Sequence, residues 1–160
     1  MNVIDQSGIL ALSTRLQRLS EQLRKDGALI YKEFGIDFEP KWFPVIFTLH
    51  HKKILSVVEI ANEIGYTHPS TISLLKELEK QKIIISKKDK SDERKRLIEL
   101  SSKGIELIKK IQPVWKLIST ILSEIADNEN HLLKAIEEVE EKIAAQSFFQ
   151  RALQMKDFNK

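Results

Sequence analysis

The chain has 160 residues, enough for one domain that buries roughly 68 to 70% of the surface its unfolded chain exposes and too few for an added catalytic domain. Hydrophobic residues at 42%, charged residues at 31%, five glycines and four prolines favour a mainly helical globular fold over a barrel or sandwich. A net charge of +3 is too small to establish nucleic-acid binding, and the lack of cysteine excludes disulfides, thiolate metal sites and thiol redox sensing.

The first ten residues lack the basic start and apolar stretch of a signal peptide. No apolar run approaches the ~18 to 20 residues that span a bilayer. We therefore expect a cytoplasmic protein with no membrane contact.

Charge is distributed unevenly along the chain. One segment is rich in basic residues: Lys82, Lys87, Lys88, Lys90, Arg94, Lys95, Arg96 and Lys103. A later segment is acidic: Asp127, Glu129, Glu137, Glu138, Glu140 and Glu141. This separation predicts a molecule with one basic and one acidic side.

The first predicted element is a long helix. Apolar residues recur at three- and four-residue steps at Leu12, Leu16, Leu19, Leu23 and Ile30, which places them on one face. The period breaks at residues 35–40, and Pro40 begins a short, very apolar helix.

A helix-turn-helix is predicted next. Ser56 and Glu59 have capping-box spacing, Gly65 is suited to ending that helix, and Thr67 can cap a second helix whose first turn accepts Pro69. In this second helix Ile72, Leu75 and Leu78 form the predicted buried stripe. The remaining face is short and polar, and is suited to base edges and phosphates: Thr67, His68, Ser70, Thr71, Ser73 and Lys76.

A β-hairpin is predicted after the second helix. The segment 83–85 is β-branched and short, residues 88–93 contain no apolar residue, and Leu97 to Leu100 form a returning strand. The turn carries the run Asp92-Glu93-Arg94-Lys95-Arg96.

Two long helices complete the chain. Ser101 caps the first, and the second begins after Asp127-Asn128 and is predicted to bury Leu132, Ile136, Val139 and Ile143, with Phe148, Phe149 and Leu153 continuing the apolar surface. Such long stripes predict a dimer interface. The fold class is thus mainly α with a small β-hairpin wing: one domain over 1–160, in which a winged helix-turn-helix lobe at 53–100 is flanked by dimerisation helices at 1–52 and 101–160.

The order of elements and the run 92–104 resemble the multiple-antibiotic-resistance regulator (MarR) family of bacterial transcription factors. The family's D-x-R wing motif, the following Leu-Ser and a helix-opening glycine match Asp92, Arg94, Leu100, Ser101 and Gly104. The helix-turn-helix pattern matches as well, at Ile60, Ala61, Pro69, Ser70, Ile72, Ser73, Leu78 and Glu79. The resemblance spans nearly the whole chain.

This resemblance implies a homodimeric repressor that binds a pseudo-palindromic operator in double-stranded DNA, with half-site centres about 34 to 36 Å apart. It implies that Arg94 enters the minor groove with Asp92 orienting it, and that the basic residues around it contact phosphates: Lys87, Lys88, Lys90 and Arg96. One position departs from the family pattern: the family usually has glycine just after the second helix, and this chain has Lys82 there. A positive φ at lysine costs roughly 1 kcal/mol. We therefore predict that the second helix ends differently here.

The resemblance also implies a small aromatic or anionic effector. The aromatic residues that are candidates for its pocket are Tyr31, Trp42, Phe43, Phe47 and Trp115. The competing interpretation is core packing, because aromatic residues at helical spacing are usually buried.

Neither a metal nor another cofactor is expected. His50 and His51 are adjacent, so on a helix they point about 100° apart and cannot easily share one ion. Catalytic motifs are absent from the sequence, which indicates a binding protein rather than an enzyme. Three alternatives stay open. The basic wing could bind an acidic protein partner, the chain could be a purely structural helical dimer that works through its apolar stripes, or the charged run 87–96 could be only a solvated hairpin.

Overall fold

The computed structural model describes residues 2–92, 94–127 and 129–158. Glu93 of the predicted turn and Asn128 before the last predicted helix lie outside the described residues. The chain forms two compact units, Met1–Trp115 and Lys116–Lys160, each of which is described by itself. Within the described ranges, no helix combines the length and apolar character required to cross a membrane.

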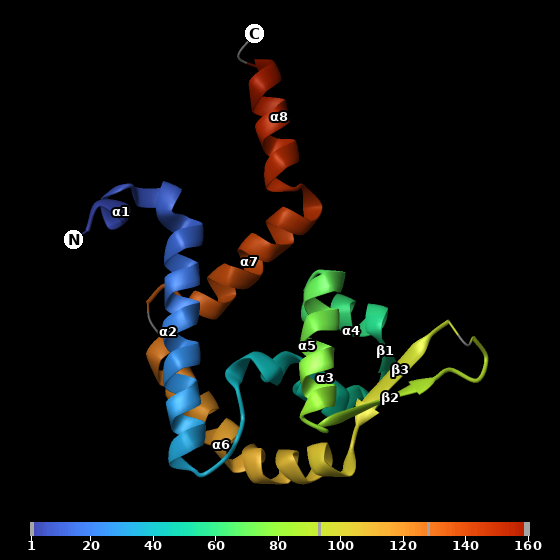
Figure 1. Ribbon diagram of the computed structural model, residues 1–160. Helices are drawn as coiled ribbons and strands as arrows, with labels where there is room; N and C mark the ends of the chain where they lie inside the picture. Colours follow the sequence, from blue (N-terminus) through green and yellow to red (C-terminus); the bar gives the residue numbers. More distant parts are fainter. Residues whose placement is uncertain (1, 93, 128, 159–160) are drawn as a thin grey trace. The chain divides into compact units, whose positions relative to one another are not determined.

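The first unit contains most of the secondary structure (Figure 1). Its N-terminal helices are α1 (Val3–Gln6), η1 (Gly8–Ala11) and α2 (Leu12–Glu33). The winged lobe follows with η2 (Pro40–Trp42), α3 (Phe43–Lys52), β1 (Ile54–Ser56), α4 (Val57–Ile64), α5 (His68–Lys80), β2 (Ile84–Lys88) and β3 (Arg96–Leu100). Helix α6 (Ser102–Ala126) begins in this unit and continues in the second.

The predicted hairpin is part of a three-stranded antiparallel sheet in the order β1-β3-β2. Strand β1, which the sequence did not predict, pairs Ile54 with Glu99 and Ser56 with Leu97. Strands β2 and β3 form the predicted hairpin, with Ile84 opposite Leu100 and Lys88 opposite Arg96. In Figure 1 the paired strands β2 and β3 extend away from the helices of the lobe, as the strands of a wing would.

The predicted capping residues at the ends of α4 and at the start of α5 are confirmed. Ser56 and Glu59 form a complete capping box, in which the Glu59 carboxylate accepts from the Ser56 backbone N–H at 2.7 Å. Gly65 has φ +69° and ends α4 in the left-handed conformation that glycine tolerates. Thr67 caps α5 through the Ser70 backbone N–H.

The buried face of α5 differs from the prediction at Thr71. Leu74, Leu75 and Leu78 are buried, Ile72 is only half-buried, and Thr71 is fully buried. The Thr71 hydroxyl donates to the Thr67 carbonyl at 3.0 Å, so its polar group is satisfied inside the core. The placement of Thr71 on the exposed polar face was therefore wrong.

The end of α5 also corrects a prediction. Lys82 has φ +59° and takes the left-handed position itself. The Ile83 N–H donates to the Leu78 carbonyl and the Lys82 N–H to the Glu79 carbonyl, which is the pattern of a Schellman motif. The expectation of a different helix end at Lys82 was wrong, because these bonds and the burial of Ile83 offset the cost of the positive φ.

Gly104 allows the start of α6 to lie against the turn after α5. A Cβ at this position would overlap the Ile83 carbonyl oxygen and lie 3.2 Å from Leu100 Cδ2. The Ser101 hydroxyl donates to the carbonyls of Lys82 and Ile83 at 2.6 and 3.0 Å, and accepts from the Gly104 N–H. The wing is thereby attached to α6 at its base.

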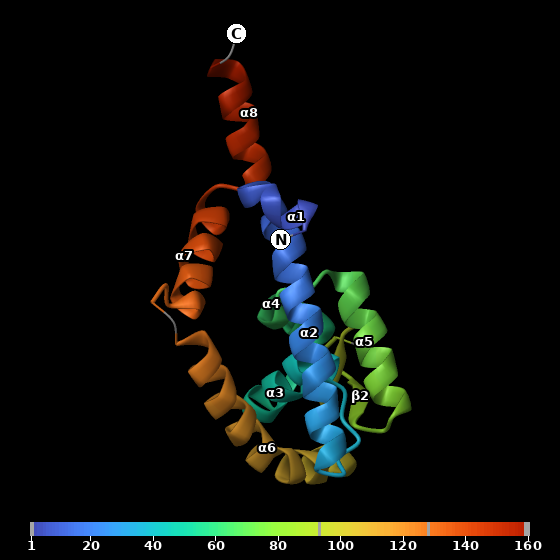
Figure 2. The ribbon, with the colours of Figure 1, turned by 90° about the vertical axis from the view of Figure 1, so that its left-hand side faces the viewer.

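The second unit contains the rest of α6 with α7 (Leu132–Ala145) and α8 (Phe148–Phe158). The sequence predicted one last helix, but Gln146 is extended and separates two helices, which Figure 2 shows as distinct rods. No residue of α7 is buried within the chain, so the expected burial of its apolar stripe is not found in the single chain. Phe148 and Phe149 are exposed as well.

Candidate nucleic-acid interface

The exposed face of α5 carries part of the predicted polar set. His68, Ser73 and Lys76 are exposed and make no capping bond. Thr67 and Ser70 are exposed too, but they are engaged with each other at the helix start, where the Thr67 hydroxyl donates to Ser70 Oγ at 2.9 Å. His68, Ser73 and Lys76 are therefore the predicted side chains most available to an external partner on this helix.

Two aspartates shape the tip of the wing. Asp89 Oδ1 accepts from the backbone N–H and the hydroxyl of Ser91, at 2.8 and 2.7 Å. These bonds hold the pKa of the Asp89 carboxyl below its ordinary value, the backbone bond being the larger cause. Asp92 Oδ1 accepts from the Arg94 backbone N–H at 3.0 Å. Asp92 thus orients Arg94 through the main chain, and among the described residues no acceptor holds the Arg94 guanidinium.

The other predicted wing cations fall into two groups. Lys88 and Lys90 are exposed. Lys87 forms an ion pair with Glu99 across the sheet, and Arg96 donates to Ser86 Oγ at 2.7 Å and lies 3.5 Å from Glu79 of α5. The cation of each ion pair is about 60% exposed, so water screens both pairs and they hold the two side chains only weakly.

A groove of about 720 Å³ lies between α5 and the wing. Of the predicted site residues it brings together His68, Lys76, Arg94 and Arg96, while Thr67, Ser70, Ser73, Lys87, Lys88, Lys90 and Asp92 do not line it. Its other walls come from the end of β1, the start of α4, α5, the strands β2 and β3 and the turn between them: Ser56, Val57, Val58, Glu59, Ile72, Leu75, Glu79, Ile84, Asp89, Lys95, Leu97 and Ile98.

Four charged residues of this groove were not among the predicted site residues: Glu59, Glu79, Asp89 and Lys95. Lys95 lines it beside Arg94 and Arg96, and the same basic run was the signal that could have identified it. Glu79 lies three residues after Lys76 on α5, and its partner Arg96 is distant in sequence, so no local pattern indicated the pair. The groove combines apolar side chains with four cations, Lys76, Arg94, Lys95 and Arg96, and three carboxylates, Glu59, Glu79 and Asp89. The cations can contact the phosphates of a polyanion.

The five predicted effector residues belong to an aromatic cluster. Trp42 and Tyr31 are buried, and the Trp115 indole N–H donates to the Tyr31 hydroxyl at 3.0 Å. Burial raises the pKa of Tyr31. Phe43 and Phe47 pack on Trp115, with ring centroids 5.4 and 5.6 Å away. None of these five residues lines a pocket described here.

The histidine pair lies at the end of α3. The rings of His50 and His51 are 5.0 Å apart and nearly perpendicular, and the His51 ring stacks obliquely on Phe47 at 4.3 Å. Within residues 2–92, 94–127 and 129–158, no three metal-binding side chains come together around a common point.

No family model and no curated protein matches the sequence. Solved structures do match. The transcriptional regulator MOSR of M. tuberculosis in complex with DNA has 16% identity and a TM-score of 0.71, covering 83% of this chain and 96% of its own. The transcriptional repressor CouR bound to a 23-mer DNA duplex has 23% identity and a TM-score of 0.64, covering 86% and 96%.

A third neighbour is BpsR of Bordetella bronchiseptica, whose DNA binding is described as regulated by 6-hydroxynicotinic acid; it has 16% identity and a TM-score of 0.58, covering 80% of this chain and 98% of its own. At these identities the matches establish the fold. The chain therefore has the winged helix-turn-helix fold of MarR-family transcriptional regulators.

Proposed function

We propose that the protein is a sequence-specific DNA-binding transcriptional regulator that acts as a homodimeric repressor on a pseudo-palindromic operator. The observation that carries the proposal is the groove that the exposed face of α5 shares with the basic wing. The DNA-bound states of MOSR and CouR, which have the same fold, support it. The chain would work by binding rather than by catalysis.

In this proposal α5 enters the major groove and the wing reaches the adjacent minor groove. His68, Ser73 and Lys76 contact base edges, with Thr67 and Ser70 at the helix start facing phosphates. Arg94 enters the minor groove, because its guanidinium lacks an internal acceptor among the described residues. The other wing cations lie along the phosphates: Lys87, Lys88, Lys90, Lys95 and Arg96.

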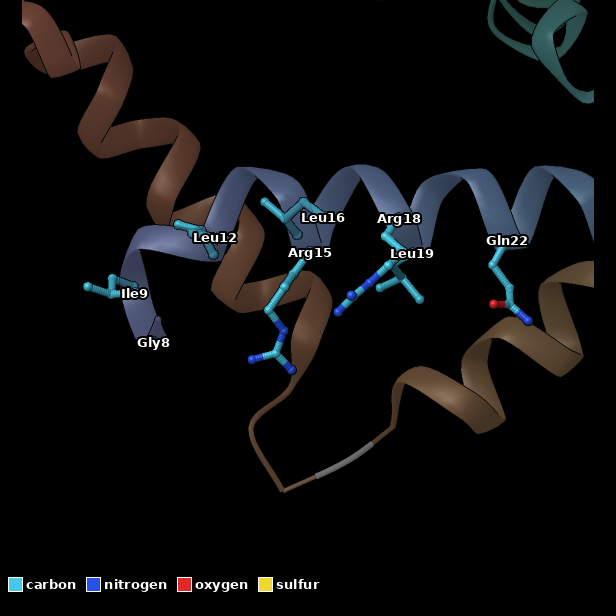
Figure 3. A pocket seen from close by; sticks show the side chains of 8 residues that line it. All are labelled: Gly8, Ile9, Leu12, Arg15, Leu16, Arg18, Leu19 and Gln22. Atoms are coloured by element: carbon cyan, nitrogen blue, oxygen red, sulfur yellow. The ribbon is translucent and has the colours of Figure 1, made fainter. Parts of the chain in front are cut away.

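Dimer formation is supported by the exposed apolar face of α2. Leu12, Leu16, Leu19 and Leu23 are 42 to 46% exposed and follow one face of the helix. A shallow groove of about 630 Å³ lies at its start, and Figure 3 shows its lining residues Gly8, Ile9, Leu12, Arg15, Leu16, Arg18, Leu19 and Gln22. A second copy of the chain would cover this surface, so Leu19→Glu should produce a monomer in light scattering, and a retained dimer would contradict this interface.

An effector, where one acts, would bind at the aromatic cluster. Phe43 and Phe47 are about 40% exposed, so their faces can accept a small aromatic or anionic molecule without opening the buried part of the cluster. BpsR supports the idea that this fold responds to small aromatic acids. A switch requires the molecule to favour one arrangement of the DNA-binding lobes over the other.

The deciding experiment is fluorescence anisotropy of the purified protein with duplexes from the intergenic regions flanking its gene, at several salt concentrations. We expect selective binding that weakens steeply with salt, because each neutralised phosphate contributes about 0.9 to the slope of log affinity against log salt. Equal, weak binding to every duplex would refute the proposal and favour a module that binds an acidic protein.

The contribution of the wing is tested by Arg94→Ala. It should weaken operator binding and reduce the salt slope by about one unit, because one cationic contact is lost. Lys134→Ala in α7 removes the same charge outside the groove and serves as the matched control. Equal effects of the two substitutions would remove Arg94 from the interface.

A further inference from the structure

Glu77 connects α5 to the aromatic cluster through a hydrogen bond to Trp42. It lies on α5 next to Lys76, but it does not line the groove. Its Oε1 accepts from the Trp42 indole N–H at 2.9 Å and from Lys41 Nζ at 2.8 Å. These donors hold the pKa of the Glu77 carboxyl below its ordinary value, with Lys41 the larger cause. Glu77 is therefore ionised at neutral pH and bound to two donors outside its own helix.

Trp42 is a rigid anchor for this bond. Its side chain is 2% exposed, and its ring meets Phe38 edge-on with centroids 5.8 Å apart. Phe38 in turn packs on Tyr31 at 4.6 Å, and Tyr31 accepts the Trp115 indole N–H. Since these rings come from α2, the segment before η2, η2 and α6, the position of the Trp42 indole is fixed by several elements at once.

The two donors to Glu77 differ in what their loss would mean. Lys41 is 44% exposed, and an ion pair in that setting contributes little because water screens it. The Trp42 N–H is attached to a buried ring, and a buried donor that loses its acceptor retains the full penalty of desolvation. The indole bond is therefore the stronger constraint.

The hydrogen bond between Trp42 and Glu77 restricts rotation of α5, which apolar core packing does not. Leu74, Leu75 and Leu78 hold α5 against the lobe by apolar contact, which is non-directional and tolerates small rotations. A hydrogen bond weakens steeply when its angle changes, so it penalises rotation of the helix about its own axis. Such a rotation would displace His68, Ser73 and Lys76 sideways relative to the base edges.

We propose that Glu77 is a positioning residue for operator recognition: by accepting the Trp42 indole N–H it fixes the orientation of α5 and thereby determines which bases its exposed face contacts. The inference rests on the proposed DNA-binding function. It predicts an effect on selectivity between DNA sequences, although Glu77 itself touches no DNA.

The test compares Glu77→Leu with Glu77→Gln in the full-length dimer. Both remove the same charge, but the glutamine oxygen still accepts from Trp42. We expect Glu77→Leu to reduce the ratio of operator to scrambled-duplex affinity about tenfold, the equivalent of one base contact. Glu77→Gln and Lys41→Gln should change that ratio by less than about twofold. The salt slope should stay the same in all three, because none of them removes a cationic contact with phosphate.

Trp42→Phe removes the N–H donor from the other side of the bond and protects the test against misfolding of Glu77→Leu. The double variant Glu77→Leu/Trp42→Phe should lose no more selectivity than the more affected single variant, since both break one interaction. Unchanged selectivity in Glu77→Leu, or an equal loss in Glu77→Gln, would overturn the proposal.

Hydrogen exchange separates this proposal from the proposed function. Equal affinity of the wild-type protein for operator and scrambled duplexes would refute the function itself. The amides of residues 68–80 then decide about the indole bond: faster exchange in Glu77→Leu but not in Glu77→Gln supports its role in holding α5, and equal exchange in both refutes it.

Discussion

Replacing Lys82 with glycine should stabilise the protein. Lys82 is the left-handed residue of the Schellman motif that ends α5, with φ +59°. It is exposed, and no described residue pairs with its ammonium group, so little is lost with the side chain. The main-chain bonds of the motif do not depend on the residue type, because they involve only N–H and C=O groups.

The expected gain follows from two opposing terms. An L-residue in the left-handed region costs roughly 1 to 2 kcal/mol relative to its preferred conformations. Glycine avoids this strain, but its unfolded chain is freer, which costs roughly 0.5 to 1 kcal/mol. The difference predicts a gain of about 0.5 to 1 kcal/mol, or about 1 to 4 °C in Tm for a chain of this size.

Thermal and urea unfolding at fixed protein concentration would measure this gain. Lys82→Ala removes the same charge but keeps a Cβ, so it should give no comparable stabilisation. Gln81→Gly places glycine one residue earlier, where φ is −74° and no strain exists, and should destabilise. If Lys82→Gly were no more stable than Lys82→Ala, strain at this position would not be the relevant quantity. Operator affinity should stay unchanged, since the helix end keeps its geometry.

Three further substitutions test other parts of the structure. Gly104→Ala should lower stability by about 1 to 3 kcal/mol in urea unfolding, because its Cβ would overlap the Ile83 carbonyl oxygen; a neutral result would mean that the turn can shift. Thr71→Val should lower the free energy of unfolding by about 1 kcal/mol, because the hydroxyl hydrogen bond is lost. It should leave operator affinity unchanged, since Thr71 is fully buried. Weaker DNA binding at equal folded fraction would instead mean that Thr71 contributes to the DNA interface. Glu59→Gln tests the capping box, because donation by Ser56 lowers the pKa of the Glu59 carboxyl below its ordinary value. The extra stability of the wild type over the variant should be present at neutral pH and decline as pH falls through the lowered pKa. A difference that grows on acidification would contradict this origin.

Local signals in the sequence predicted the helix-turn-helix and the wing. The capping box of Ser56 and Glu59, the turn glycine Gly65 and the alternation of strands and charged turn all depend on neighbouring residues. Strand β1 was missed because three residues carry no detectable alternation and their partner β3 lies more than forty residues away. The burial of Thr71 was missed because a threonine hydroxyl can satisfy itself on the helix backbone, which makes its polarity a poor guide to exposure.

The error at Lys82 has a different origin. The prediction considered only the conformational cost of a positive φ at lysine and left out the hydrogen bonds and burial that accompany it. Two main-chain bonds and the burial of Ile83 depend on the chain turning at that residue. The Trp42 bond to Glu77 was not predicted either, because residues thirty-five apart in sequence give no local sign of contact.

In the proposed function, the relative position of α5 and the wing decides whether both can reach adjacent grooves of DNA at once. The ion pair between Glu79 and Arg96 joins them directly, but its 3.5 Å separation and exposure make it a weak constraint. Stronger constraints lie underneath: Ile84 and Ile98 are buried below α5, and the turn through Lys82 and Ile83 is fixed to α6 by Ser101 and by the close approach at Gly104. Breaking the ion pair with Glu79→Gln should therefore alter operator affinity much less than displacing the turn with Gly104→Ala, when both are compared at equal folded fraction. The opposite order would mean that the charged residues of the groove, and not the apolar packing beneath them, determine the spacing between helix and wing.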